Sequence, residues 1–343
     1  MPFKDITGHA HIHELLARAA SRGSLPPSLI FAGPEGVGKR ATAMALAQML
    51  NCLALPPAGS GTDDGDGPVP DACGVCAACR RIMRGVHADV LVVEPGETGS
   101  IKVEQVREAI DRTAYRPFEG RRRVVIIDAA DALVMPAQDA LLKTLEEPPP
   151  ASVFVLVTSK PDVLLPTVRS RCQRLRFGRL SPADVAAVLM GAHEYSERDA
   201  FAAASLSDGS VGAALEGSSE GVVDARDAAV ELLETVAAST DPHRRLQGAK
   251  ALGGAGRGTS DRDALARRLQ ALSSILRDLG VLLSRADERS LANADLRPRL
   301  ERLQRSFDGE RALRAFSAVD RAQHALERNA SPKIVADWIA FQI

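Results

Sequence analysis

The sequence predicts an α/β domain built on a parallel sheet, followed by helices alone. Three observations predict this fold class. A glycine-rich phosphate-binding pattern stands between an apolar strand and a helix, further apolar strands alternate with helical patterns up to about residue 180, and no convincing strand pattern follows Ser181. Strands that are apolar throughout are typical of parallel sheets whose two faces are covered by helices.

The first element is the GxxxxGK pattern of a phosphate-binding P-loop. It places Gly33, Gly36, Gly38 and Lys39 between an apolar strand at 29–32 and a helix at 41–50. Glycines let backbone N–H groups close on phosphate oxygens, and the helix that follows points the positive end of its dipole at them. Arg40, however, stands where a Ser or Thr hydroxyl would bind Mg²⁺. We therefore expect weak binding of ATP or ADP at most.

A second P-loop element is a buried strand that ends in an acid. Residues 123–127, followed by Asp128, supply it. Asp128 is a candidate Mg²⁺ ligand, and a carboxylate that caps the strand end is the alternative. Ala129 comes next, so the Glu that would polarise an attacking water is missing. Because phosphoryl transfer depends on positioning and electrostatics, we expect little or no ATP hydrolysis.

Four of the five cysteines form an insert after the P-loop helix, over about residues 52–80. Cys73, Cys76 and Cys79 follow the spacing Cys-x2-Cys-x2-Cys, and Cys52 lies upstream. Four thiolates can satisfy one tetrahedral Zn²⁺, and no acid–base group accompanies them, so we expect a closed structural zinc site. Redox pairing and an iron–sulfur cluster are the alternatives.

The remaining patterns complete the sheet and mark domain boundaries. Apolar strands are expected at 91–93 and 153–157, and helices at 103–110 and 137–145. Ser181 and Pro182 supply an N-cap and a first-turn proline, which open a new helical region. We expect a P-loop α/β domain over 1–180, a small helical domain over 181–221 and a larger helical domain over 222–343.

Charge and hydropathy limit the partners of the chain. Its 43 basic and 44 acidic side chains exclude a strongly basic protein overall. The segment 243–314 has 16 Arg or Lys against 9 Asp or Glu, which indicates a solvated helix surface or, alternatively, contact with DNA or an acidic partner. No stretch is apolar enough for a membrane span, and the first 16 residues lack the apolar core of a signal peptide. We expect a cytoplasmic protein without a membrane partner.

Two further stretches carry a family resemblance. Residues 140–149 read ALLKTLEEPP, and residues 165–172 read LPTVRSRC. With the four-cysteine insert, they resemble the bacterial clamp loaders of DNA polymerase III, and in particular the delta prime branch of that family. The resemblance covers about residues 1–180, and beyond it only the helical character agrees.

The resemblance implies an AAA+ module, a helical lid and a C-terminal collar that assembles a pentameric ring. The implied partners are gamma/tau ATPase subunits and a delta subunit, and through the complex the sliding clamp and primer-template DNA. Arg171 would reach the ATP of a neighbouring subunit in trans, where a surface salt bridge is the alternative. Thr158 would occupy a sensor position, for which strand-end capping is the alternative. Gly212 stands where active members place a lid arginine, and we have no account of Asp139.

The preferred interpretation is a non-hydrolysing clamp-loader subunit, part of the DNA polymerase III holoenzyme, that donates Arg171 and braces a hetero-oligomeric ring. A slow AAA+ ATPase or remodeller is one alternative, and the residues at Arg40 and Ala129 argue against it. A zinc-ribbon DNA-binding protein with a relic P-loop is the other. The cysteine segment lacks the aromatic side chains and dense basic flank that such a protein would need.

Overall fold

The computed structural model describes residues 1–57, 69–216, 221–239, 241–253, 259–286, 291–328 and 330–343. The chain divides into two compact units, Met1–Arg179 and Leu180–Ile343. No helix within the described residues combines the length and the apolar character that crossing a bilayer requires.

The first unit contains five strands and the helices that connect them. In chain order these are α1 (Ala10–Arg22), β1 (Ser28–Ala32), α2 (Lys39–Asn51), α3 (Ala77–Met83), β2 (Val90–Val93), α4 (Val103–Thr113), β3 (Arg123–Ile127), α5 (Met135–Glu146), β4 (Ser152–Thr158), α6 (Pro166–Arg169) and β5 (Gln173–Arg176), with short 3₁₀ turns at Phe3–Asp5, Ala130–Ala132 and Pro161–Val163.

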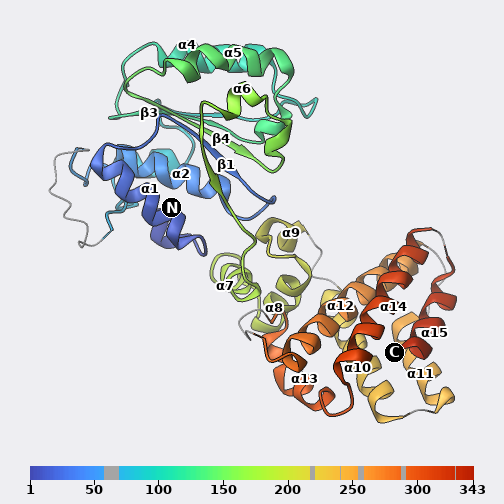
Figure 1. Ribbon diagram of the computed structural model, residues 1–343. Helices are drawn as coiled ribbons and strands as arrows, with labels where there is room; N and C mark the ends of the chain where they lie inside the picture. Colours follow the sequence, from blue (N-terminus) through green and yellow to red (C-terminus); the bar gives the residue numbers. More distant parts are fainter. Residues whose placement is uncertain (58–68, 217–220, 240, 254–258, 287–290, 329) are drawn as a thin grey trace. The chain divides into compact units, whose positions relative to one another are not determined.

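The five strands form one parallel sheet in the order β2-β3-β4-β1-β5. Every residue of β1, β3 and β4 is buried, because helices cover both faces. Figure 1 shows α1 and α2 on one face and α4 and α5 on the other. The predicted parallel α/β sheet, followed by helices, is therefore confirmed.

Helix α2 is buried on more than one side, and several of its buried residues are small. Ala43, Ala45 and Ala47 are fully buried, next to Leu46. Alanine has the highest intrinsic helix propensity, and its single methyl group lets the helix backbone approach the strands closely. The helix that follows the P-loop is thus closely packed within the first unit.

The second unit is entirely helical among its described residues. Its helices are α7 (Pro182–His193), α8 (Glu197–Leu206), α9 (Val211–Glu216), α10 (Val222–Ala238), α11 (Pro242–Gly253), α12 (Thr259–Leu283), α13 (Arg297–Leu303), α14 (Gly309–Glu327) and α15 (Pro332–Gln342), with a 3₁₀ turn at Ala294–Leu296. The predicted N-cap is confirmed, since the Ser181 hydroxyl oxygen accepts a hydrogen bond from the Asp184 N–H at 3.1 Å.

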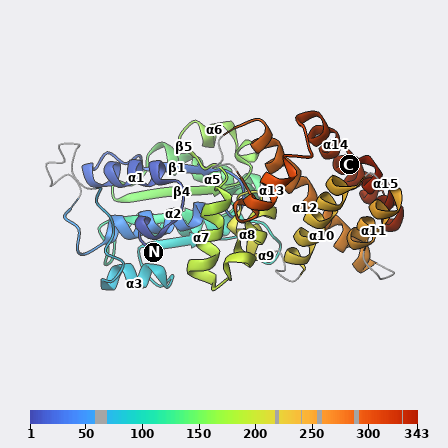
Figure 2. The ribbon, with the colours of Figure 1, turned by 90° about the horizontal axis from the view of Figure 1, so that it is seen from below.

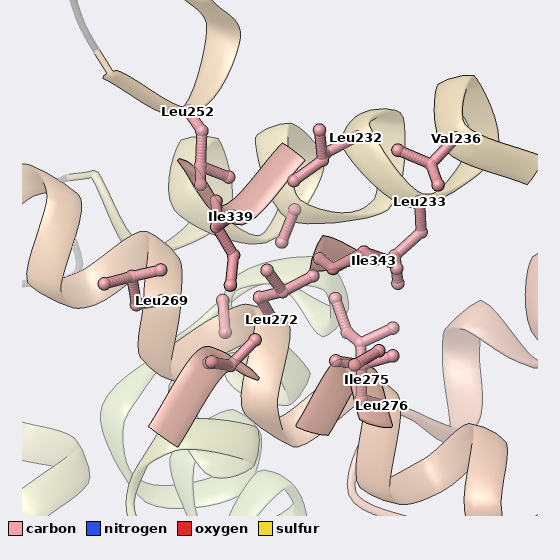
Figure 3. Packing of buried hydrophobic residues seen from close by; sticks show 14 of the residues in the cluster. Leu232, Leu233, Val236, Leu252, Leu269, Leu272, Ile275, Leu276, Ile339 and Ile343 are labelled. Atoms are coloured by element: carbon pink, nitrogen blue, oxygen red, sulfur yellow. The ribbon is translucent and has the colours of Figure 1, made fainter. Parts of the chain in front are cut away.

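Two hydrophobic clusters lie within this unit. One is formed by α7, α8 and α9. The other draws on helices from α10 to α15, and in Figure 3 side chains such as Leu233, Leu272 and Ile339 converge in it. The expected division at Gly221 falls between the helices of these two clusters, and it stays a proposal.

Candidate functional site

Because the five strands are parallel, the residues that follow them meet at one end of the sheet, where all the strands finish. There β1 leads into the P-loop, β2 into Glu94, β3 into Asp128 and β4 into Ser159. Ligand sites of open α/β sheets lie at the carboxyl ends of the strands. The sheet therefore places the two predicted P-loop elements at the same end, with the end of β4 between them.

Three glycines set the shape of the P-loop. A Cβ atom on Gly33 would lie 2.2 Å from the carbonyl oxygen of Phe177, so no larger residue fits. Gly38 has a φ of +96°, in the left-handed region that favours glycine, and Gly36 has a φ of +69°. The loop thus has the backbone shape that brings the N-terminus of α2 to a bound anion.

Lys39 is turned back onto its own loop. Its Nζ donates to the carbonyl oxygen of Gly33 at 2.7 Å and also to that of Pro34. Burial lowers the pKa of Lys39, and nearby acids including Glu35 oppose that effect. A phosphate would have to compete with these two carbonyl groups for the ammonium.

Arg40 takes the position at which a Ser or Thr hydroxyl would bind Mg²⁺, and its side chain contacts two acids. Its Nη1 lies 2.8 Å from Oδ2 of Asp128 and also pairs with Glu94. The guanidinium therefore bridges two carboxylates that follow the neighbouring strands β3 and β2. Its planar, permanently charged donors suit two acids at once. It places a positive charge between the two carboxylates.

Thr158 connects the end of β4 to the turn after Asp128. It is buried, and its hydroxyl donates to Oδ1 of Asp131 at 2.7 Å. Burial raises the pKa of Asp131, but hydrogen bonds from Thr158 and from the Ser159 N–H outweigh it, so the pKa lies below its usual value. The Ser159 hydroxyl also bonds to Glu35 of the P-loop at 3.1 Å. The Thr158 region is thus tied to both P-loop elements.

The four cysteines of the insert come together as the sequence predicts. One sulfur atom from each of Cys52, Cys73, Cys76 and Cys79 lies within 4.8 Å of the others. All five cysteines of the chain lie in its described part, and each is a free thiol. Four converging thiols are a ligand set that suits Zn²⁺.

Backbone N–H groups support the sulfur atoms. The Cys73 N–H donates to the Cys52 sulfur at 3.4 Å, and the Cys76 N–H donates to the Cys73 sulfur at 3.3 Å. Burial raises the pKa of Cys76, but hydrogen bonds from the Cys79 and Leu53 N–H groups and from neighbouring thiols lower it to about 6. Burial raises the pKa of Cys79. A metal ion would be needed to hold all four groups as thiolates.

Arg171 lies at the opposite end of the sheet from the P-loop, where the strands begin. It precedes β5, whereas Phe177, which contacts the P-loop at Gly33, follows β5. Its Nη1 donates to the Thr167 carbonyl oxygen at 2.8 Å, and its Nη2 pairs with Glu146. Its side chain is 32% exposed. Arg171 is therefore separated from the P-loop of its own chain by the length of a strand.

Sequence reasoning missed three of the acids that matter here. Glu94 is the first ionisable residue after the apolar strand β2, and Asp131 lies three residues after Asp128. Those positions were the available signals. Glu146 lies inside the ALLKTLEEPP stretch, and nothing local indicates that it pairs with Arg171.

A profile of the family described as DNA polymerase III, delta subunit, matches residues 8–181. The match covers half of the chain and every residue of the candidate site. The chain belongs to the DNA polymerase III delta-subunit family. Its α/β unit is accordingly of the AAA+ clamp-loader type.

Relatives of this delta-family chain include subunits with other names. It is 34% identical over 187 residues to DNA polymerase III subunit gamma/tau of Mycobacterium tuberculosis, an alignment that covers 54% of this chain and 30% of the relative. It is 34% identical over 179 residues to DNA polymerase III subunit tau of Bacillus subtilis, covering 52% and 29%. The matched region is thus less than a third of these relatives.

Solved structures include similar chains at low scores. A DNA polymerase III gamma-subunit-related protein of Thermotoga maritima has a TM-score of 0.38 at 19% identity, over 95% of this chain and 96% of that chain. A DNA clamp loader delta protein of Bacillus subtilis has a TM-score of 0.36 at 13% identity, over 95% and 98%.

Proposed function

We propose that this delta-family chain is a delta prime type subunit of the bacterial clamp loader, and that it takes part in loading the sliding clamp without hydrolysing ATP itself. The observation that carries the proposal is the pairing of Arg40 with Asp128 and Glu94. A catalytic P-loop needs Mg²⁺ beside the acid that follows its second strand. In this chain a tethered guanidinium already stands there.

These ion pairs are weak. The side chains of Arg40 and Glu94 are each about half exposed, and such pairs contribute little to stability. What matters is position, because a cation approaching Asp128 meets a fixed positive charge. Ala129 adds a second defect, since no carboxylate follows Asp128 to orient a water molecule.

The place of Arg171 supports its role as a finger for a neighbouring subunit. The four residues of β5 separate Arg171 from the end of the sheet that carries the P-loop, a distance of about 13 Å along the strand. The side chain cannot serve its own P-loop from there, whereas its partial exposure leaves it accessible to another molecule. Its ion pair with Glu146 would have to open when it engages the ATP of that molecule.

The rest of the chain takes supporting roles in this proposal. The four cysteines hold a structural zinc ion, helices α7, α8 and α9 form the lid, and helices α10 to α15 form a collar that joins the ring. The ring consists of this subunit, gamma/tau type ATPases and a delta subunit, and it acts on the clamp and on primer-template DNA. ATP or ADP binds the P-loop of this chain weakly at most.

Two measurements test the proposal. The purified chain should show no ATP turnover, whereas a complex reconstituted with gamma/tau and delta subunits should load clamps onto primed DNA only when this chain is present. A turnover in the usual enzymatic range of roughly 1–10³ per second, abolished by Lys39→Ala, would instead make the chain an ATPase in its own right. Clamp loading at the same rate without the chain would refute the proposed role.

A further inference from the structure

A surface at the amino-terminal end of the strands, opposite the end that carries the P-loop, takes no part in the site described above. It is formed by residues 77–88, which include α3 (labelled in Figure 2), and by residues 112–122, which lead from α4 into β3. The two segments are in contact. Nη2 of Arg81 lies 2.7 Å from Oε2 of Glu119, and the Ala88 N–H donates to Oε1 of Glu119 at 3.2 Å.

The charge of this surface is strongly one-sided. The two segments contain seven arginines, and Glu119 is their single acid. Arg80, Arg84 and Arg116 are exposed, and within the described part of the chain their side chains have no hydrogen-bond or ion-pair partner. Three uncompensated guanidinium groups attract a polyanion.

Two exposed aromatic residues flank Arg116 in the second of these segments. Tyr115 is 75% exposed and Phe118 is 85% exposed. Aromatic rings this open to water are available for stacking. The rings come from the loop after α4, so they are distant in sequence from the arginines of α3.

The backbone of the loop that carries Phe118 is held by hydrogen bonds to one carboxylate. The N–H groups of Phe118, Glu119 and Gly120 donate to the Asp89 carboxylate at 2.8, 2.8 and 2.7 Å. Asp89 is fully buried and pairs with Arg123 at 2.7 Å. Because the backbone is already ordered, a ligand that stacks on Phe118 does not have to order it.

We propose that this basic–aromatic surface, defined as Arg80, Arg84, Arg116, Tyr115 and Phe118, binds single-stranded nucleic acid. Phosphates would pair with the free guanidinium groups while unpaired bases stack on the rings, which is how proteins hold single strands without reading their sequence. In a duplex the base faces are covered by their neighbours. An apolar protein partner would bury the arginines without counter-charges, at a high desolvation cost.

This inference goes beyond the proposed function, which requires no contact between this chain and DNA, so each can fail without the other. The cysteine segment by itself lacks aromatic side chains. Through Glu119, the fold brings the segment that carries Tyr115 and Phe118 into contact with residues 77–88, although it begins more than thirty residues after Cys79. The aromatic residues that the cysteine segment lacks are therefore supplied by a different part of the chain.

Binding of a fluorescein-labelled oligothymidine of roughly 16 nucleotides to the full chain, followed by fluorescence anisotropy, tests the proposal. We expect Phe118→Ala to weaken binding about tenfold, and Phe118→Leu to weaken it nearly as much, because leucine is apolar but cannot stack. The triple change Arg80→Ala, Arg84→Ala and Arg116→Ala should reduce the slope of log affinity against log salt by about 2.

Matched variants separate this surface from general effects. Arg112→Ala removes a guanidinium from the same region that already pairs with Glu108 at 2.8 Å, and Phe316→Ala removes a partly exposed ring from the second unit. Both should bind like the unchanged chain, and zinc content and melting temperature should confirm folding for every variant. The proposal is wrong if the unchanged chain does not bind the oligothymidine at about 50 mM salt, if the triple variant binds equally well, or if duplex DNA or polyglutamate binds as tightly.

Discussion

Nη1 of Arg40 lies 2.8 Å from Oδ2 of Asp128, and the same guanidinium pairs with Glu94. One residue of the P-loop thereby joins the acids that follow β2 and β3. In the proposed nucleotide site, the Arg40 side chain therefore takes the place beside Asp128 that a metal ion would need.

Arg40→Thr should make nucleotide binding depend on Mg²⁺. The substitution removes the tethered charge and adds a hydroxyl ligand, so Mg²⁺ can approach Asp128. We expect ATP to bind the variant more tightly with Mg²⁺ than without it in calorimetric titrations, still without turnover because Ala129 offers no base. Arg40→Thr combined with Asp128→Asn is the control that should lose this Mg²⁺ dependence. Equal affinities with and without Mg²⁺ in the single variant would refute the role given to Arg40.

The reduced, purified chain should contain one tightly bound zinc ion, and Cys76→Ser should release it. Serine removes a thiolate from a four-sulfur set, and neutral oxygen binds zinc poorly. Metal analysis measures the loss. Cys172→Ser is the matched control, because this fifth cysteine is buried away from the cluster and burial raises its pKa to about 12. No zinc in the unchanged protein, or full zinc in Cys76→Ser, would exclude the assignment.

Arg171→Ala should slow DNA-stimulated ATP hydrolysis and clamp loading by the reconstituted complex. Arginine fingers raise rates by roughly 10³ to 10⁵ in known cases, so even one affected site should be visible in kcat. Arg171→Lys should not restore the rate, since an ammonium lacks the planar fork. Arg169→Ala removes a neighbouring guanidinium that pairs with Asp162 at 2.7 Å, and it should leave the rate unchanged. An Arg171→Ala complex working at the normal rate would reduce this subunit to a structural brace.

The stability of the first unit should fall between about pH 6.5 and about pH 4 because of His13. This ring is buried, stacks on Phe3 and lies with Nε2 3.0 Å from the Thr42 hydroxyl. Burial, with His9 nearby, lowers its pKa to about 4. The unfolded chain therefore takes up the proton first, and the folded state loses up to about 3 kcal/mol as the pH falls through this range.

Urea unfolding at about pH 7.5 and about pH 5 measures that loss. His13→Asn cannot gain a charge, so its unfolding free energy should change less between the two pH values than that of the unchanged protein. The same pH dependence in both proteins would show that other groups cause it.

Sequence patterns predicted four of the sheet's strands, β1 to β4, because each contains a run of consecutive apolar residues and helical patterns alternate with them. They did not predict β5, Gln173–Arg176, in which only Leu175 is apolar. This strand lies at the edge of the sheet and pairs with β1 alone. Its side chains need not be buried on both faces, so local composition does not mark it as a strand.

By itself the sequence determined the α/β class, the P-loop with its missing hydroxyl and the set of four cysteines, because these depend on short-range periodicity and spacing. Only the tertiary structure decided what Arg40 contacts, since Asp128 lies 88 residues away and Glu94 follows a different strand. It also decided that Arg171 and the P-loop lie at opposite ends of the strands. Strand order and direction set these distances, and they follow from how the whole domain packs, which no local pattern encodes.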